Sequence, residues 1–113
     1  MKEERSIFKG NEGEELNYIK WSPDGDTIAV IQIIHGMAEH KERYEKFAEF
    51  LVKNNITVYI ADIRGHGEHI NSSTEGYFHE ENGWNRVVED MRIFTEKISK
   101  ENEGKPLFIL GHS

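Results

Sequence analysis

The sequence predicts an α/β protein whose helices cover both faces of a mainly parallel sheet. Short apolar runs of strand length alternate along the chain with amphipathic stripes of helical period. Strands that alternate with helices of this length need crossover connections, which make the strands parallel and place the helices on the faces. We therefore expect an antiparallel hairpin that leads into a parallel β-α-β-α-β sheet.

The hairpin is predicted from residues 16–34. Apolar and polar side chains alternate over residues 16–21, as in a half-exposed strand. Residues 22–26 read Ser-Pro-Asp-Gly-Asp and predict a turn, because proline presets φ and glycine accepts a positive φ. The next apolar run covers residues 28–34 and is nearly continuous, which is typical of a strand buried on both faces. We expect these two strands to pair.

Two helices and two further strands follow in alternation. The first helix is predicted to end at Asn54-Asn55, because asparagine adopts the left-handed conformation that closes a helix. A strand follows over residues 56–61, and the second helix ends near Gly104, with Pro106 beyond it and a last strand over residues 107–110. The side chains expected to face the core are Tyr44, Phe47, Ala48, Leu51 and Val52 on the first helix, and Trp84, Val87, Val88, Met91, Phe94 and Ile98 on the second.

The composition excludes several classes of protein. In 113 residues, 36% hydrophobic and 11% aromatic side chains are too many for a disordered chain. No window approaches the roughly 18 apolar residues of a membrane span, and no apolar core follows the first charges as in a secretory signal. A net charge of −7 disfavours nucleic-acid binding, and the lack of cysteine excludes disulfides and thiolate sites. We expect a globular cytoplasmic chain.

Glycine and histidine follow each of the three predicted parallel strands. The segments are His35-Gly36-Met37-Ala38-Glu39-His40, Asp62-Ile63-Arg64-Gly65-His66-Gly67 and Gly111-His112-Ser113. Because the carboxyl ends of parallel strands share one edge, where ligands bind, we expect these turns to be neighbours. Gly-x-Ser after a strand is the first half of a nucleophile elbow. The His-Gly turn can aim the backbone N–H of Met37 at an oxyanion, which is worth about 2.7–4 kcal/mol in a transition state.

These motifs, at these intervals, resemble the monoacylglycerol lipase and lysophospholipase group of α/β-hydrolases. The similarity extends from about Leu16 to the last residue and includes Gly76-Tyr77-Phe78 and Trp84. The resemblance implies an α/β-hydrolase fold that cleaves lipid esters without a cofactor, with Ser113 as the acylated nucleophile and the Met37 N–H as one oxyanion donor. The second donor would be the residue after the serine. The residues expected to line the substrate site are His35, Gly36 and His112.

The resemblance also implies that residues 1–113 are the N-terminal portion of one α/β-hydrolase domain, ending at the nucleophile elbow. The triad of this family runs Ser, Asp or Glu, then His, whereas all six histidines here precede Ser113. We therefore expect the cap and C-terminal strands to be absent and residues 1–113 alone to be inactive. The strand at 107–110 would be an exposed apolar edge that pairs with a C-terminal half chain or with a second copy.

Other interpretations stay open at this point. An esterase or aminopeptidase of the same fold is one, because a scaffold fixes the chemistry better than the substrate. A non-catalytic binding or assembly module is another. A metal-dependent hydrolase is a third, although the His-Glu-x-x-His spacing is absent and we expect no metal. Its candidate ligands would be His35, Glu39, His40, His66, Glu68 and His69.

Three residues at the predicted edge have a structural interpretation beside the functional one. Asp62 is expected to be a strand-end residue that ties down its loop. His35 and His112 are expected to pack and form hydrogen bonds rather than to carry protons, because the general base of this family follows the serine.

Overall fold

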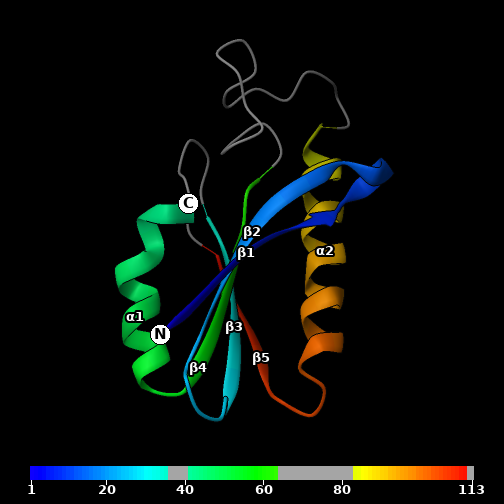
Figure 1. Cartoon of the computed structure of the whole chain (residues 1–113). Helices are drawn as coiled ribbons and strands as arrows, with labels where there is room; N and C mark the ends of the chain where they lie inside the picture. Colours follow the sequence, from blue (N-terminus) through cyan, green and yellow to red (C-terminus); the bar gives the residue numbers. More distant parts are fainter. Residues whose placement is uncertain (36–40, 64–82, 112–113) are drawn as a thin grey trace.

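The computed structural model describes residues 1–35, 41–63 and 83–111, in which a five-stranded mixed sheet lies between two helices (Figure 1). The elements are β1 (Lys2–Lys9), the 3₁₀ turn η1 (Asn11–Gly13), β2 (Glu15–Ser22), β3 (Ala29–Ile34), the 3₁₀ turn η2 (Lys41–Tyr44), α1 (Glu45–Lys53), β4 (Ile56–Ala61), α2 (Gly83–Glu101) and β5 (Leu107–Gly111). The strand order is β1-β2-β4-β3-β5. Helix α1 covers one face of the sheet and α2 covers the other, as predicted.

Strand β3 is paired in parallel with β4 on one side and with β5 on the other. The prediction of parallel strands joined by helices is therefore confirmed. The connections after β3 and β4 lead to helices on opposite faces of the sheet. In α/β proteins, ligands bind at the carboxyl edge where the connections diverge in this way.

The antiparallel hairpin consists of β1 and β2, not of β2 and β3. Strand β1 pairs with β2 from Lys2↔Ser22 to Lys9↔Glu15, and the other neighbour of β2 is β4. The predicted pairing of residues 16–21 with residues 28–34 is therefore wrong. Strand β4 takes the position between them, because nearly all of its side chains are buried and such a strand is most stable inside the sheet.

No apolar pattern in the sequence marks β1. Phe8 is its only buried residue, and charged side chains fill most of its other positions. Backbone hydrogen bonds to β2 hold this strand in the sheet. The indole of Trp21 adds a side-chain link, since its Nε1–H donates to Oε1 of Glu3 at 2.9 Å.

Strand β2 is buried on both faces, whereas a half-exposed strand was predicted. Leu16 and Tyr18 belong to the core on the α2 side of the sheet. Ile19 and Trp21 belong to the core on the α1 side. Because both faces of the sheet are covered here, both sets of alternating side chains are withdrawn from water.

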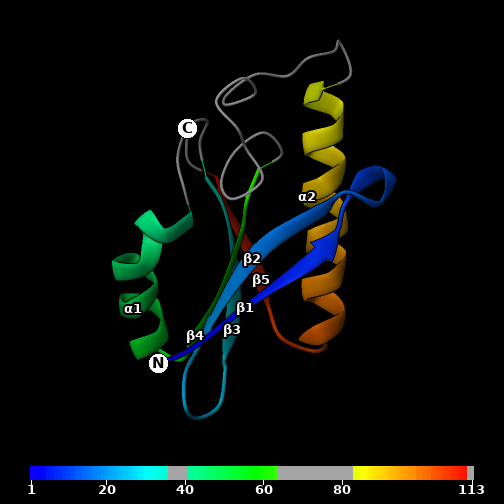
Figure 2. The same ribbon diagram turned by 45° about the horizontal axis from the view of Figure 1, so that its top comes forward.

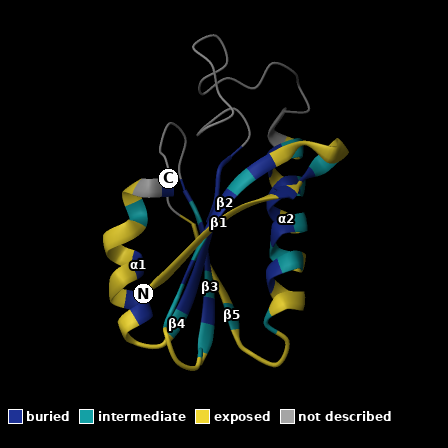
Figure 3. Ribbon diagram, viewed as in Figure 1, coloured by how far each residue is buried: buried dark blue, intermediate teal, exposed yellow. Residues whose placement is uncertain are grey.

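Two apolar cores lie on the two sides of the sheet (Figure 3). The core beside α2 contains Phe8, Leu16, Tyr18, Val30, Tyr59, Ala61, Met91, Phe94 and Ile98. The core beside α1 contains Ile19, Trp21, Ile33, Ala48, Leu51, Val52, Val58 and Ile60. Strands β3 and β4 supply residues to both cores, as expected of strands buried on both faces.

Two residues assigned to the core-facing stripes lie at the surface instead. Phe47 on α1 is 42% exposed and Val88 on α2 is 53% exposed. Among the described side chains of α2, which begin at Asn85, the buried ones are Val87, Asp90, Met91, Phe94 and Ile98. Successive residues are about 100° apart around a helix, so Val88 points to one side of the face that Val87 buries. Asp90 borders this buried face on the opposite side, and its carboxylate is buried there. The side chain of Trp84 lies outside the described residues.

The tip of the β1–β2 hairpin is attached to α2 (Figure 2). The Asp90 carboxylate is fully buried, and its Oδ1 accepts a hydrogen bond from the backbone N–H of Asn11 at 2.7 Å. Arg86 of α2 forms a surface ion pair with Glu12, with Nη2 and Oε2 3.2 Å apart. Gly10 lies against the same carboxylate, because a Cβ at this position would be 2.4 Å from Oδ1 of Asp90.

Gly10→Ala is expected to lower the free energy of unfolding by about 1–3 kcal/mol, because the added methyl group must displace a buried, hydrogen-bonded carboxylate. Gly25→Ala is the matched control, since a Cβ there meets no atom within 4 Å and the backbone is not left-handed. Urea unfolding of the parent and both variants measures the difference. Equal stability of the two variants would contradict the close approach at Gly10.

Strand β5 forms the edge of the sheet opposite β1. Phe108, Ile109 and Leu110 are all exposed, with Phe108 58% accessible to solvent. The exposed apolar edge predicted for residues 107–110 is therefore present among the described residues.

Candidate active site

The carboxyl ends of β3, β4 and β5 meet at one edge of the sheet, at the top of Figure 1. Ile34 of β3 pairs with Gly111 of β5, and Ile33 of β3 pairs with Ile60 of β4. The last residues of the three strands therefore lie side by side. Residues that directly follow these strands are attached to the same edge.

The predicted site residues begin where β3 and β5 end. His35 directly follows β3, and its side chain is buried with 1% exposure. The other predicted site residues, which lie outside the described residues, are Gly36, Met37, His112 and Ser113. The structure thus brings together the ends of β3 and β5, the strands that precede Met37 and Ser113 in the sequence.

Of the six residues considered as metal ligands, His35 is the one that lies within the described part of the chain. The others, outside it, are Glu39, His40, His66, Glu68 and His69. Among residues 1–35, 41–63 and 83–111, no group of three or more His, Asp or Glu side chains is arranged to hold a metal ion. The described residues therefore add no support to the metal interpretation.

A buried ion pair lies at the same edge and joins the chain after β3 to the end of β4. Lys41, the first residue of η2, places its Nζ 2.9 Å from Oδ1 of Asp62, which directly follows β4. Both side chains are buried. The backbone N–H of Asp62 donates to the carbonyl of Asn17 in β2 at 2.9 Å, so Asp62 is fixed to the sheet.

Sequence reasoning identifies one member of this pair and misses the other. Asp62 is expected at a strand end, and the structure places it there, with its carboxylate bound to Lys41. Lys41 stands in the charge-rich stretch His-Lys-Glu-Arg-Tyr-Glu-Lys, in which a lysine is normally solvent-exposed. Its position shortly after a strand that ends at the same edge is the only signal that it could meet Asp62.

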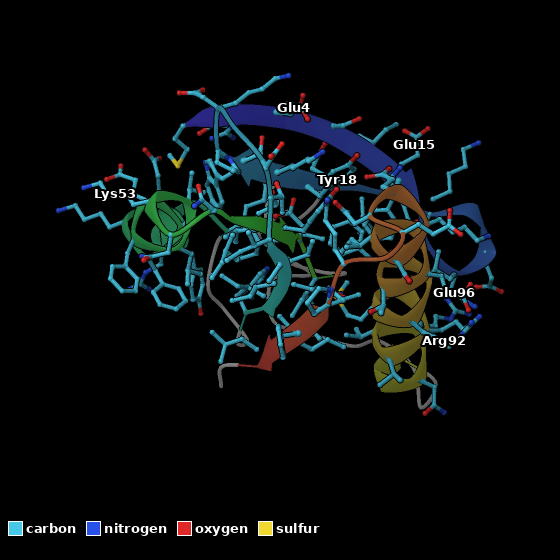
Figure 4. The ribbon with its side chains drawn as sticks, turned by 90° about the horizontal axis from the view of Figure 1, so that it is seen from below. Glu4, Glu15, Tyr18, Lys53, Arg92 and Glu96 are labelled. Atoms are coloured by element: carbon cyan, nitrogen blue, oxygen red, sulfur yellow. The ribbon has the colours of Figure 1, made fainter. Side chains whose placement is uncertain are left out.

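Charged and phenolic groups on α2 and β4 have structural partners away from this edge. Arg92 binds Glu89 and Glu96 on the outer side of α2, facing away from the sheet (Figure 4). The Arg92 guanidinium holds the pKa of Glu89 below its usual range. Burial raises the pKa of Tyr59 far above its usual range, and its hydroxyl donates to Oε1 of Glu101 at 2.9 Å. Tyr59 is therefore a neutral structural group.

A cavity of about 450 Å³ lies at the other end of the sheet. It is lined by the turn before β3, the end of α1 and the chain start, with the residues Met1, Pro23, Asp24, Gly25, Glu49, Val52, Lys53 and Asn55. Active sites of α/β sheets form at the carboxyl ends of the strands, whereas this cavity lies at their amino ends. We therefore place the candidate active site at the carboxyl edge of the sheet and not in this cavity.

Parallel strands that end in register at one edge, between helices on both faces, form an α/β architecture, and two solved structures identify it as an α/β-hydrolase fold. The chain matches a soluble variant of monoglyceride lipase from Saccharomyces cerevisiae, in complex with a substrate analog, with a TM-score of 0.83 and 25% identity over 100% of this chain and 36% of that chain. A carboxyl esterase from Bacillus coagulans shares the fold, with a TM-score of 0.82 and 20% identity over 96% of this chain and 36% of that chain.

Residues 25–113 match the family described as serine aminopeptidase, S33, and the chain belongs to this family. It is 32% identical over 102 residues to the monoglyceride lipase of Homo sapiens, covering 90% of this chain and 32% of that protein. It is 32% identical over 112 residues to the monoacylglycerol lipase of Mycolicibacterium smegmatis, covering 94% and 36%. The chain thus spans about a third of the length of these relatives. Within its described portion, no helix is both long and apolar enough to span a membrane.

Proposed function

We propose that this chain is the N-terminal part of a serine hydrolase that cleaves carboxylic esters of lipids, such as monoacylglycerol or lysophospholipid. The observation that carries the proposal is the parallel pairing of β3 with β5, which ends at Ile34↔Gly111. Met37 and Ser113 follow these paired residues at three and two positions. An acyl carbonyl bound at this edge is therefore expected to reach both. The names of the relatives, monoglyceride and monoacylglycerol lipase, support a lipid ester as substrate.

In the proposed reaction, the Ser113 hydroxyl attacks the ester carbonyl while its proton passes to a general base. The N–H groups of Met37 and of the residue after Ser113 stabilise the resulting oxyanion, and the alcohol leaves with a proton. Water then attacks the acyl-serine and releases the carboxylic acid. His35, Gly36 and His112 are proposed to line the acyl site, and no cofactor takes part.

Residues 1–113 alone are proposed to be inactive. A serine hydroxyl without a base is a poor nucleophile, and the acid and base of this fold follow the serine in chain order. A C-terminal portion would supply them. The exposed apolar edge of β5 supports addition of strands from that portion, or of a second copy where it is absent.

A fluorophosphonate probe, which reacts with activated serine hydroxyls, tests this proposal. We expect a label on Ser113, mapped by mass spectrometry, when residues 1–113 are supplied with a C-terminal portion of the domain, and no label on residues 1–113 alone. Ser113→Ala should remove the label, whereas Ser99→Ala, at an exposed serine of α2, should retain it. Hydrolysis that a chelator abolishes while Ser113 stays unlabelled would favour the metal interpretation instead.

Peptide hydrolysis is the second candidate function, because the matched family is described as serine aminopeptidase. Both reactions use the same acyl-serine chemistry and differ in the leaving group. Comparison of turnover on a monoacylglycerol and on an aminoacyl anilide, with the same labelled protein, distinguishes them. Faster turnover of the anilide than of the monoacylglycerol would favour peptide hydrolysis over ester hydrolysis as the function.

A further inference from the structure

Helix α1 covers only part of its face of the sheet. It packs mainly on β4 and β2, and the strand order leaves β3 and β5 as the next two strands on the same face. A helix with its side chains is about 10–12 Å wide and strands are about 4.7–4.9 Å apart, so one helix covers about two strands. Of the helices that the structure describes, only α1 lies on this side of the sheet (Figure 1). The face over β3 and β5 is therefore as wide as one further helix.

Strand β5 presents two apolar side chains on this face. Phe108 pairs with Ile31 and Leu110 pairs with Ile33 in the parallel register, and residues paired in this way point to the same side of a sheet. Ile33 belongs to the core on the α1 side, and Ile31 packs against that core. Phe108 is 58% exposed and Leu110 is 41% exposed. The apolar layer that begins under α1 thus continues across β3 to β5, where it is open to solvent.

The flank of α1 that faces β3 and β5 is also apolar. Residues are about 100° apart around a helix, so Phe47 and Phe50 lie on one flank of the buried stripe and Glu49 lies on the other. Glu49 lines the cavity together with Met1, which precedes β1, so the Glu49 flank faces the β1 side of the sheet. The opposite flank therefore faces β3 and β5, and its Phe50 is exposed like Phe47.

A C-terminal portion of the domain is the occupant that fits this face best. The faces of sheets in α/β proteins are covered by helices, and a contiguous apolar surface of this kind marks a contact with other protein. The solved monoglyceride lipase from Saccharomyces cerevisiae contains the fold of this whole chain within 36% of its own chain. The larger part of that relative packs around the shared fold. Phe47 and Phe50 also have the i, i+3 spacing by which one helix contacts another.

We propose that the surface formed by Phe47, Phe50, Phe108 and Leu110 is the docking site for one amphipathic helix of the C-terminal portion, which lies beside α1 and over β3 and β5. This inference rests on one part of the proposed function, that residues 1–113 are the N-terminal part of a larger domain. The docked helix presents an apolar stripe to these four side chains, with its axis about 8–10 Å from that of α1. Docking uses the face of β5, whereas strand addition uses its backbone edge.

A single introduced thiol tests whether the surface is covered, because the chain contains no cysteine. In the chain that carries its C-terminal portion, Phe50→Cys is expected to react with a maleimide at least about 10-fold more slowly than Glu49→Cys. Glu49 is the matched control, since it is exposed on the opposite flank of the same helix. Mass spectrometry of the peptide that contains each thiol measures the two rates. Equal rates would overturn the docking site.

A photoactivated cross-linker attached at Phe47→Cys or Phe50→Cys identifies the occupant. We expect cross-links to residues beyond Ser113 of the same chain, at positions three, four and seven residues apart, as on one side of a helix. Cross-linked positions two residues apart would indicate a strand instead. Cross-links between copies that carry different isotopes would indicate a second copy of the chain. Either of these two results would overturn the proposal.

Labelling of Ser113 by a fluorophosphonate in the same protein separates this inference from the proposed function. A labelled Ser113 together with a fully reactive thiol at position 50 overturns the docking site, and the serine hydrolase assignment stands. A protected thiol with helical cross-links but no label on Ser113 overturns the proposed reaction, and the docking site stands.

Discussion

Phe94→Ala is expected to lower the free energy of unfolding by about 3–5 kcal/mol, the range for truncation of a buried phenylalanine. Phe94 has no exposed surface and lies at the centre of the core on the α2 side. Its ring stacks on Phe8 with centroids 4.6 Å apart and contacts the rings of Tyr18 and Tyr59 at 5.2 and 6.1 Å. One substitution thus removes aromatic contacts that α2 makes with β1, β2 and β4.

Val88→Ala on the same helix provides the control, because Val88 is exposed and its truncation leaves no cavity. It is expected to change stability by no more than about 0.5 kcal/mol. Urea denaturation followed by circular dichroism compares the parent with both variants. Similar losses in the two variants would show that the face of α2 assigned to the core is wrong.

Met37→Pro is expected to slow ester hydrolysis by about 10²–10³-fold in the chain supplied with its C-terminal portion. The proposed role of Met37 uses only its backbone N–H, and proline has none. Met37→Ala keeps the N–H and removes most of the side chain, so it should retain most of the parental kcat. The contrast between these two variants isolates the backbone donor.

Steady-state kinetics on a soluble short-chain ester measure kcat and KM for both Met37 variants. An oxyanion donor acts in the transition state, so the loss in Met37→Pro should fall on kcat with KM little changed. Equal activity of the proline and alanine variants would remove Met37 from the mechanism. A loss in the alanine variant alone would point to a side-chain contact with the substrate.

The elements that carry core side chains could be predicted from the sequence, and the order of the strands could not. Strands β3 and β4 and both helices show apolar patterns because each buries a defined face. Strand β1 shows none, since backbone hydrogen bonds hold it and Phe8 is its only buried residue. The place of β4 between β2 and β3 depends on competition among distant segments, which no local pattern records.

The candidate site also contains features that the sequence predicts and one that it does not. Gly-x-Ser and His-Gly are predicted at the site because each follows an apolar run, and the strands that precede them, β3 and β5, are paired in parallel as expected. Lys41 could not be found, because its burial depends on Asp62, which is 21 residues away in the sequence. A charged residue is recognisable as buried only when its partner is known.

The two edge strands of the sheet, β1 and β5, differ in how readily another strand can pair with them. The first half of strand β1 carries the charged residues Lys2, Glu3, Glu4 and Arg5, and such charges discourage pairing with another strand. Strand β5 presents apolar side chains on the opposite side. If two copies joined through their β5 edges, the outer edges of the dimer would be the two largely charged β1 strands, and this contact would close on itself. Assembly by this route would then be self-limiting and would not propagate into a fibre.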